Sequence, residues 1–254
     1  MFLSEGEVQS FVRNGYTIAK GVFPLSLAEH MVDELWDAMP EDRSDSSTWD
    51  RPGFLLHHSI RDSVYPELFT DKLRAAISDL LGEDRWTEAG RLEYHPIKFP
   101  NSEPPWSFPD TGWHVDGDWF HHYLDGVFQP LVLLPAWTDI KPHGGATVVK
   151  PGSHKHAARI VADADPEGLN NREISEKARE VCADIQPVEV LPNAGDVVLL
   201  HHFTLHAGSP NCGTSIRMIS NMYVHLKQRA CFNLLDGDYL PYEKAIVEAL
   251  ELKA

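Results

Sequence analysis

The sequence predicts a mainly β protein with flanking helices. Two observations lead to this prediction: amphipathic patterns at helical spacing are concentrated in residues 1–85, and short β-prone runs separated by Pro, Gly and Asn dominate residues 86–228. Such runs are typical of a β-sandwich or β-barrel. The chain has 254 residues, of which 43% are hydrophobic, so it can bury a large core. We predict a single domain, 1–254, that ends in a helix at 241–253.

Three helices are expected in the N-terminal region. Ser4 begins a capping-box pattern, and the helix that follows it ends at Gly15. Ser26 is the expected cap of the second helix, because an apolar stripe at helical spacing follows it. Asp71 precedes the third helix, whose apolar stripe ends at Gly82.

The expected strands are Tyr16–Ala19, Arg91–Tyr94, Leu131–Ile140, Ala146–Val149, Pro187–Leu191, Asp196–His202 and Ile216–Leu226. Pro135 indicates a bulge or a sheet edge in the third of them, because proline has no N–H to donate. The polar segment 40–53 predicts a loop, and the insertion 157–184 predicts one amphipathic helix. We expect both segments to flank the mouth of a site.

Composition excludes several classes of partner. The chain carries 22 Lys and Arg against 38 Asp and Glu, a formal net charge of −16, which opposes binding to nucleic acid or to an anionic membrane. Three cysteines without paired spacing fit a reducing compartment. The first residues show no leader pattern, and no 18-residue apolar run occurs, so the expected location is cytoplasmic.

A His-x-Asp pair suggests a metal site. In an extended strand, His114 and Asp116 would project from one face. Open iron(II) sites use two His and one carboxylate, and the second His would come from a distant segment in which His201, His202 and His206 compete. The pair alone is weak evidence, since a hydrogen-bonded His at a strand end is the alternative.

Arg217 is a candidate anchor for a dicarboxylate. Ser215 lies two positions earlier, so both side chains would share a strand face. An Arg beside a hydroxyl can bind a carboxylate through two charged hydrogen bonds. A surface salt bridge is the alternative, but an Arg in so apolar a strand favours a buried partner.

Four ordered motifs are similar to those of a known family. They are GWHVD at 112–116, AWT at 136–138, GGATVVKPGSHK at 144–155, and AGD at 194–196 followed by His206 and Arg217. In order and spacing they resemble the phytanoyl-CoA dioxygenase family. The resemblance implies a double-stranded β-helix core, also called a jelly roll or cupin-like fold. It also implies a dioxygenase that uses Fe(II), 2-oxoglutarate and O2, with ascorbate as a candidate reductant.

The resemblance also implies a set of metal ligands. His114, Asp116 and His206 correspond to the iron ligands of the family. This assignment leaves His201 and His202 outside the metal site. No catalytic side chain beyond the metal centre is implied.

The resemblance also implies which residues bind 2-oxoglutarate. Arg217 corresponds to the Arg that pairs with the distal carboxylate, with Ser215 as a further candidate. Trp137 corresponds to a Trp of the cosubstrate pocket, with an ordinary core aromatic as the alternative. The strand near Glu93 resembles that of ectoine hydroxylases, but Glu93 and Ala89 replace the amides expected there.

Trp119, His121 and His122 are candidate substrate residues, with simple packing as the alternative. We expect hydroxylation of a small metabolite, of amino-acid or natural-product origin, with release of succinate and CO2. Desaturation, epimerisation and cyclisation stay open, and a jelly-roll binding protein is the non-enzyme alternative. The net charge favours a neutral or cationic substrate over acyl-CoA.

Overall fold

The computed structural model describes residues 1–232 and 237–251. Its strands are β1 (Tyr16–Ala19), β2 (Gly53–Ile60), β3 (Trp86–Glu88), β4 (Leu92–Lys98), β5 (Leu131–Pro135), β6 (Thr147–Val149), β7 (Val188–Val190), β8 (Val197–His201), β9 (His206–Gly208), β10 (Arg217–Met218) and β11 (Met222–Leu226). Its helices are α1 (Glu5–Asn14), α2 (Leu25–Ala38), α3 (Tyr65–Leu68), α4 (Asp71–Leu81), α5 (Ser153–Ala162), α6 (Asn171–Val181) and α7 (Pro241–Glu251), with a 3₁₀ helix η1 (Ser46–Thr48). No helix among the described residues is long and apolar enough to cross a membrane.

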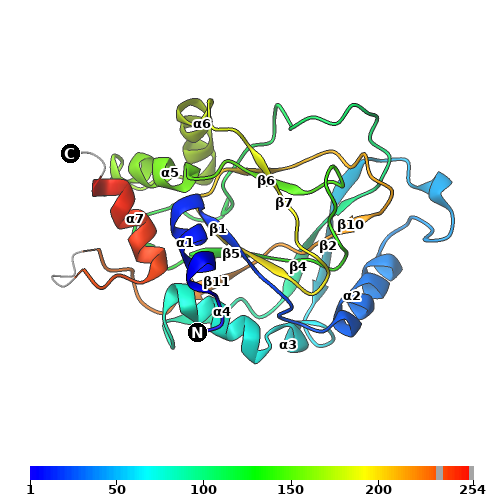
Figure 1. The fold of residues 1–254 in the computed structure, drawn as a ribbon, viewed down its shortest axis with the longest axis horizontal. Helices are drawn as coiled ribbons and strands as arrows, with labels where there is room; N and C mark the ends of the chain where they lie inside the picture. Colours follow the sequence, from blue (N-terminus) through cyan, green and yellow to red (C-terminus); the bar gives the residue numbers. More distant parts are fainter. Residues whose placement is uncertain (233–236, 252–254) are drawn as a thin grey trace.

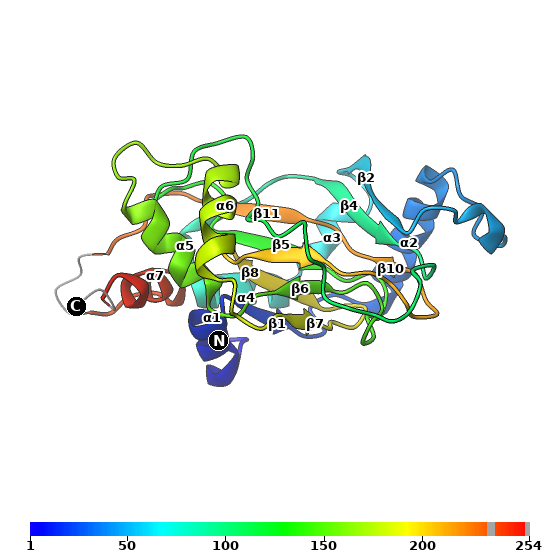
Figure 2. The same cartoon turned by 90° about the horizontal axis from the view of Figure 1, so that it is seen from above.

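The described strands form three antiparallel sheets, ordered β1-β8-β5-β11-β3, β10-β4-β2 and β7-β6-β9. The chain passes repeatedly between the five-stranded sheet and the two smaller ones, which is the predicted double-stranded β-helix. Helices α1, α5, α6 and α7 lie at one end of the sheets and α2 at the other (Figures 1 and 2). The predicted mainly β fold with flanking helices is therefore confirmed.

The centre of the core is the pair β5 and β8. Their register runs from Leu131 opposite His201 to Pro135 opposite Val197, and every residue of both strands is buried. Both faces of this pair are covered, so the two strands read as continuous apolar runs without alternation. The main hydrophobic cluster extends from Leu3 to Ala249 in α7. That extent supports the single-domain prediction, which stays a prediction.

The predicted start of the helix is confirmed for α1, whereas α2 and α4 begin differently from the prediction. Ser4 accepts a hydrogen bond from the Glu7 backbone in a full capping box. The predicted Ser26 cap is wrong, because α2 begins at Leu25 without a side-chain cap. The helix expected after Asp71 begins at Asp71 itself, and Thr70 caps α4 by accepting a hydrogen bond from the backbone of Leu73.

Two predicted segments differ in kind from the observed elements. Residues 1–85 are not only helical, because β2 pairs antiparallel with β4 from Gly53 opposite Lys98 onward. The segment 157–184 contains the end of α5 and all of α6, where one helix was predicted. Asn170 starts α6 with its own capping box, which separates the two helices.

Two long predicted strands are shorter than expected. The strand predicted at Leu131–Ile140 ends at Pro135. The strand predicted at Ile216–Leu226 divides into β10 and β11, because Ile219 bridges to Ala136 while Asn221 bridges to Tyr94. At this point the chain passes from a three-stranded sheet to the five-stranded one. Of the predicted helix 241–253, residues 252 and 253 lie outside the described residues.

Candidate metal centre and cosubstrate site

Two segments far apart in the sequence bring His114 and His206 together. Their backbones form an isolated antiparallel bridge, in which the His114 N–H donates to the His206 carbonyl at 2.9 Å and the His206 N–H donates to the His114 carbonyl at 3.0 Å. Opposite residues of such a pair direct their side chains to one face. The two ring centroids are accordingly 4.4 Å apart. His201 and His202 lie apart from this pair, buried in the core.

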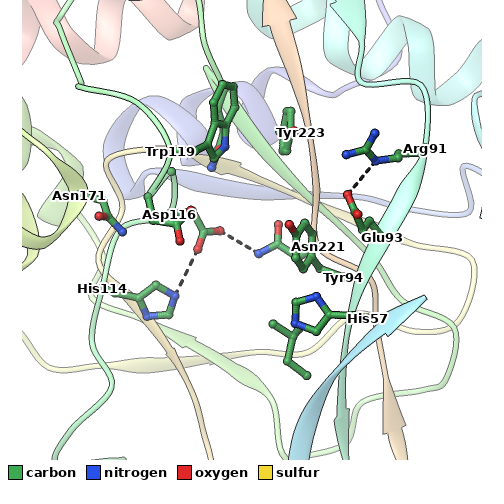
Figure 3. A pocket seen from close by; sticks show the side chains of 14 residues that line it. His57, Arg91, Glu93, Tyr94, His114, Asp116, Trp119, Asn171, Asn221 and Tyr223 are labelled. Atoms are coloured by element: carbon green, nitrogen blue, oxygen red, sulfur yellow. Dashed lines mark hydrogen bonds and ion pairs between the residues drawn. The ribbon is translucent and has the colours of Figure 1, made fainter. Parts of the chain in front are cut away.

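The Asp116 carboxylate lies between these two imidazoles. Its Oδ1 is 3.3 Å from His114 Nε2, and its Oδ2 is 3.6 Å from His206 Nε2. The three potential ligand atoms all lie within 4.8 Å of one another. Asn221 donates to Asp116 Oδ2 at 2.9 Å (Figure 3). Three ligands gathered in this way can bind one face of a metal ion.

Both histidines keep Nε2 available for a metal. His114 Nδ1 contacts the Gly112 carbonyl at 2.7 Å, and His206 Nδ1 contacts the Thr204 carbonyl at 3.0 Å. A hydrogen bond from Nδ1–H to a carbonyl places the lone pair on Nε2 and holds the ring orientation. Two imidazole nitrogens and one carboxylate are a donor set that fits iron(II).

The charges of the triad favour a cation. Burial acts to raise the pKa of Asp116, but His206, His114 and Asn221 together hold this pKa well below its ordinary value. Burial, followed by repulsion from His114, lowers the pKa of His206. Burial also acts to lower the pKa of His114, yet its hydrogen bond to Asp116 and the charge of that carboxylate raise it overall. The site therefore offers a carboxylate and a neutral His206 imidazole at neutral pH.

A cavity of about 670 Å³ opens at the triad. Its walls come from β2, β4, β11, the start of α6 and the segment that follows the metal motif (Figure 3). The His114 side chain is 46% exposed, whereas that of His206 is 7% exposed, so the triad is open on the His114 side. The volume is in the range of small-molecule sites.

Of the substrate candidates, Trp119 lines this cavity. His121 and His122 line a separate cavity of about 230 Å³, so the structure does not bring them into the cavity at the triad. His122 is buried, its Nε2 contacts the Gly117 carbonyl at 3.1 Å, and it does not line the cavity at the triad. The spacing of aromatic residues along the sequence does not reveal which of the two cavities each ring lines.

The two predicted flanking segments also differ. Segment 157–184 contributes Asn171 to the cavity, whereas no residue of 40–53 lines it. Segment 40–53 instead packs on the core, where Trp49 stacks on Phe99 with centroids 5.3 Å apart. The structure therefore does not place 40–53 in the wall of this cavity. In contrast, Leu55 and His57 on β2, which the sequence did not identify as a strand, line the cavity.

Arg217 is a buried cation, only 3% exposed. Its Nη1 donates to the Pro96 carbonyl at 3.2 Å and its Nη2 donates to Thr147 Oγ1 at 2.9 Å, while Nε has no partner. None of the ion pairs formed by the described residues includes Arg217. Burial lowers its pKa to about 9, which leaves it charged at neutral pH. Because a buried charge is costly without a counter-charge, this environment fits a bound carboxylate.

Lys98 is a second cation, which the sequence patterns did not identify. It lies directly opposite Arg217 across β4 and β10, so both side chains share a face. Burial, and then the charge of Arg217, lower the pKa of Lys98. A Cβ atom added to Gly208 would lie 3.8 Å from Lys98 Nζ. Gly208 is two residues after His206 on β9, about 7 Å along the strand, so a short dicarboxylate can reach from the triad toward both cations.

Ser215 lies elsewhere than expected, whereas Trp137 is a buried core residue. Ser215 is exposed in the bend before β10, and Thr147 supplies the hydroxyl at Arg217 instead. Trp137 is buried in the main core cluster, and its ring packs against Phe23 with centroids 5.1 Å apart. This packing fits the core-aromatic alternative, and a role of Trp137 at 2-oxoglutarate stays a prediction.

A jelly roll that presents two histidines and one carboxylate on one face defines the class of non-haem metal oxygenases. The model of the family described as phytanoyl-CoA dioxygenase (PhyH) matches residues 11–219. The chain belongs to this family. Membership makes it an iron(II)- and 2-oxoglutarate-dependent dioxygenase.

Individual proteins that resemble this chain share low sequence identity with it. Ectoine dioxygenase from Stutzerimonas stutzeri (strain A1501) is 26% identical over 240 residues, covering 85% of this chain and 74% of that protein. HygX from Streptomyces hygroscopicus, solved with nickel, 2-oxoglutarate and hygromycin B, aligns with a TM-score of 0.53 at 18% identity, covering 89% of this chain and 88% of HygX. The epimerase SnoN, solved with Fe3+, alpha ketoglutarate and nogalamycin RO, aligns at 0.54 and 19% identity, covering 93% and 92%. These two likenesses show the fold.

Proposed function

We propose that this dioxygenase hydroxylates a small metabolite at iron(II) bound by His114, Asp116 and His206, with 2-oxoglutarate anchored by Arg217 and Lys98. The observation that supports this assignment most directly is the pair of partly or fully buried cations. Arg217 and Lys98 lie opposite each other on one sheet face, and neither forms an ion pair with a described residue. Lys98 lies near Gly208 on β9, the strand that also carries His206. A dicarboxylate neutralises such a pair, and two charged contacts orient it.

The reaction outcome follows from the ligand set and from the relatives together. Asp116 would hold the metal through its carboxylate, which disfavours binding of a halide there, so hydroxylation with release of succinate and CO2 is the proposed outcome. The relatives include a protein named as an epimerase, SnoN, and one named as a carbocyclase, SnoK. Epimerisation and cyclisation are therefore alternative outcomes of the same site, and desaturation is a further one.

A polyanionic acyl-CoA is a poor match for the cavity. Among the described residues that line it, the only arginine is Arg91, which pairs with Glu93 at 2.7 Å, and none is a lysine. Without a free cation the cavity cannot compensate phosphate charges. Three cysteines without paired spacing fit a reducing compartment, and we propose a cytoplasmic location.

The experiment that tests the proposed function uses protein loaded anaerobically with iron(II). Oxygen is then admitted with 2-oxoglutarate and each of a set of candidate metabolites, and succinate formation and substrate mass are followed together. Substrate-dependent succinate with a mass gain of one oxygen supports the proposal. Stoichiometric binding of iron and 2-oxoglutarate without any succinate formation identifies the chain as a binding protein and overturns it.

A further inference from the structure

An unpaired carboxylate lies beside the triad. Asp118 lines the same cavity, is exposed, and forms no hydrogen bond or ion pair with any residue that the structure describes. The other acidic side chains of the cavity are engaged: Glu93 by Arg91 at 2.7 Å, and Asp116 by the two histidines of the triad. Apart from the metal ligand Asp116, Asp118 is therefore the acidic residue of this cavity whose negative charge no described residue compensates.

An aromatic wall lies next to this carboxylate. Trp119 is 52% exposed, yet its ring packs against Phe120 at 4.7 Å, Phe128 at 5.2 Å and Tyr223 at 5.9 Å between centroids. Figure 3 shows Trp119 and Tyr223 on one side of Asp116. A large exposed ring that its neighbours hold in place is suited to contact with a ligand.

The backbone between the two carboxylates keeps this arrangement compact. Gly117 separates Asp116 from Asp118 and has φ of +95°, a conformation that favours glycine. A Cβ atom at Gly117 would lie 2.7 Å from the Phe120 ring. The metal ligand, the unpaired carboxylate and the exposed ring are thus fixed in one short segment.

From these contacts we infer that the substrate is an organic cation, a ring-sized molecule with a protonated amine. Asp118 binds the ammonium group, and Trp119 contacts the ring and the adjacent positive charge through its π face. The inference rests on the proposed function and specifies its substrate class. A carboxylate or phosphate in the same position would meet Asp118 without any free cation, which excludes anionic substrates.

The test measures binding of three matched probes: cyclohexylmethylamine, cyclohexylmethanol and cyclohexanecarboxylate. Protein loaded with iron(II) and 2-oxoglutarate is kept without oxygen, and ligand-observed NMR gives the relative affinities. We expect the amine to bind about tenfold more tightly than the alcohol, the order of a partly exposed ion pair together with a cation–π contact. Asp118→Asn should remove this preference. Asp184→Asn, an exposed acidic position outside the cavity, should retain it.

The aromatic contribution has its own variant pair. Trp119→Phe keeps a π face and should retain most of the amine preference, whereas Trp119→Leu should reduce it. Equal responses to the three probes in the unmodified protein, including no response to any of them, would overturn the inference. Tighter binding of the carboxylate, or an amine preference that survives Asp118→Asn unchanged, would do the same.

Failure of this inference can be separated from failure of the proposed function. Probe binding needs no turnover, so an amine preference without succinate formation would contradict only the proposed function. Succinate formation without an amine preference would contradict only the substrate class.

Discussion

Acidification should destabilise this protein well before its carboxylates titrate. Five histidines outside the metal triad are buried: His95, His122, His154, His201 and His202. Burial is the main cause that lowers the pKa of each one, to about 4 for His95 and His122, to about 3 for His154, and well below the ordinary value for His201 and His202. Unfolding restores a pKa near 6.5 to all of them.

The sign and size of the effect follow from proton linkage. Because the folded pKa values are depressed, the unfolded state binds more protons, so the stability is complete above about pH 6.5 and is lost as the pH falls below it. At about pH 5.5, each histidine that stays neutral in the folded state lowers the free energy of unfolding by about 1.4 kcal/mol. For all five histidines, the loss in unfolding free energy is at most about 7 kcal/mol, which is comparable with the whole net stability of a typical domain. In the metal-free triad, the raised pKa of His114 opposes this loss and the lowered pKa of His206 adds to it.

The assay is urea unfolding of metal-free protein, followed by tryptophan fluorescence, at about pH 7.5, 6.5 and 5.5. His202→Phe removes one buried titrating ring, so the fall in unfolding free energy between about pH 7.5 and 5.5 should shrink by about 1.4 kcal/mol, whatever its effect at neutral pH. His121→Phe, at an exposed position, should leave the fall unchanged. A fall smaller than about 1.4 kcal/mol in the unmodified protein would refute the reasoning, because it would mean that the buried rings do not stay neutral.

Three further predictions concern the site. His206→Ala should abolish stoichiometric iron binding, measured as iron content after gel filtration, whereas His121→Ala should retain it; the reverse pattern would exclude the assigned triad. Arg217→Ala should weaken 2-oxoglutarate binding by about 2 to 5 kcal/mol in calorimetry while iron still binds, and Ser215→Ala should leave it unchanged; equal affinities would rule out the anchor. Asn221→Leu should lower iron affinity about 10- to 100-fold by releasing the ligand carboxylate, and an unaltered affinity would show that this hydrogen bond is dispensable.

Local sequence was sufficient for features whose partners lie within a few residues. The capping box at Ser4 is an interaction between positions three apart, and the His114 and Asp116 pair depends only on a two-residue interval. Arg217 was also recognisable, because a charged residue within an apolar strand needs a compensating partner wherever the strand lies. Family motifs then added His206, which spacing alone left in competition with His201 and His202.

Tertiary structure decided every feature that depends on which strands pair and in which register. Lys98 joins the site only because β4 places it opposite Arg217, and β2 contributes to the cavity only through its pairing with β4. Likewise Thr147, and not the nearby Ser215, meets the guanidinium, since β10 begins after the bend that carries Ser215. A one-residue change of register reverses the face of every side chain in a strand, and register is set by burial and pairing over the whole sheet. For that reason local sequence patterns could not supply these contacts.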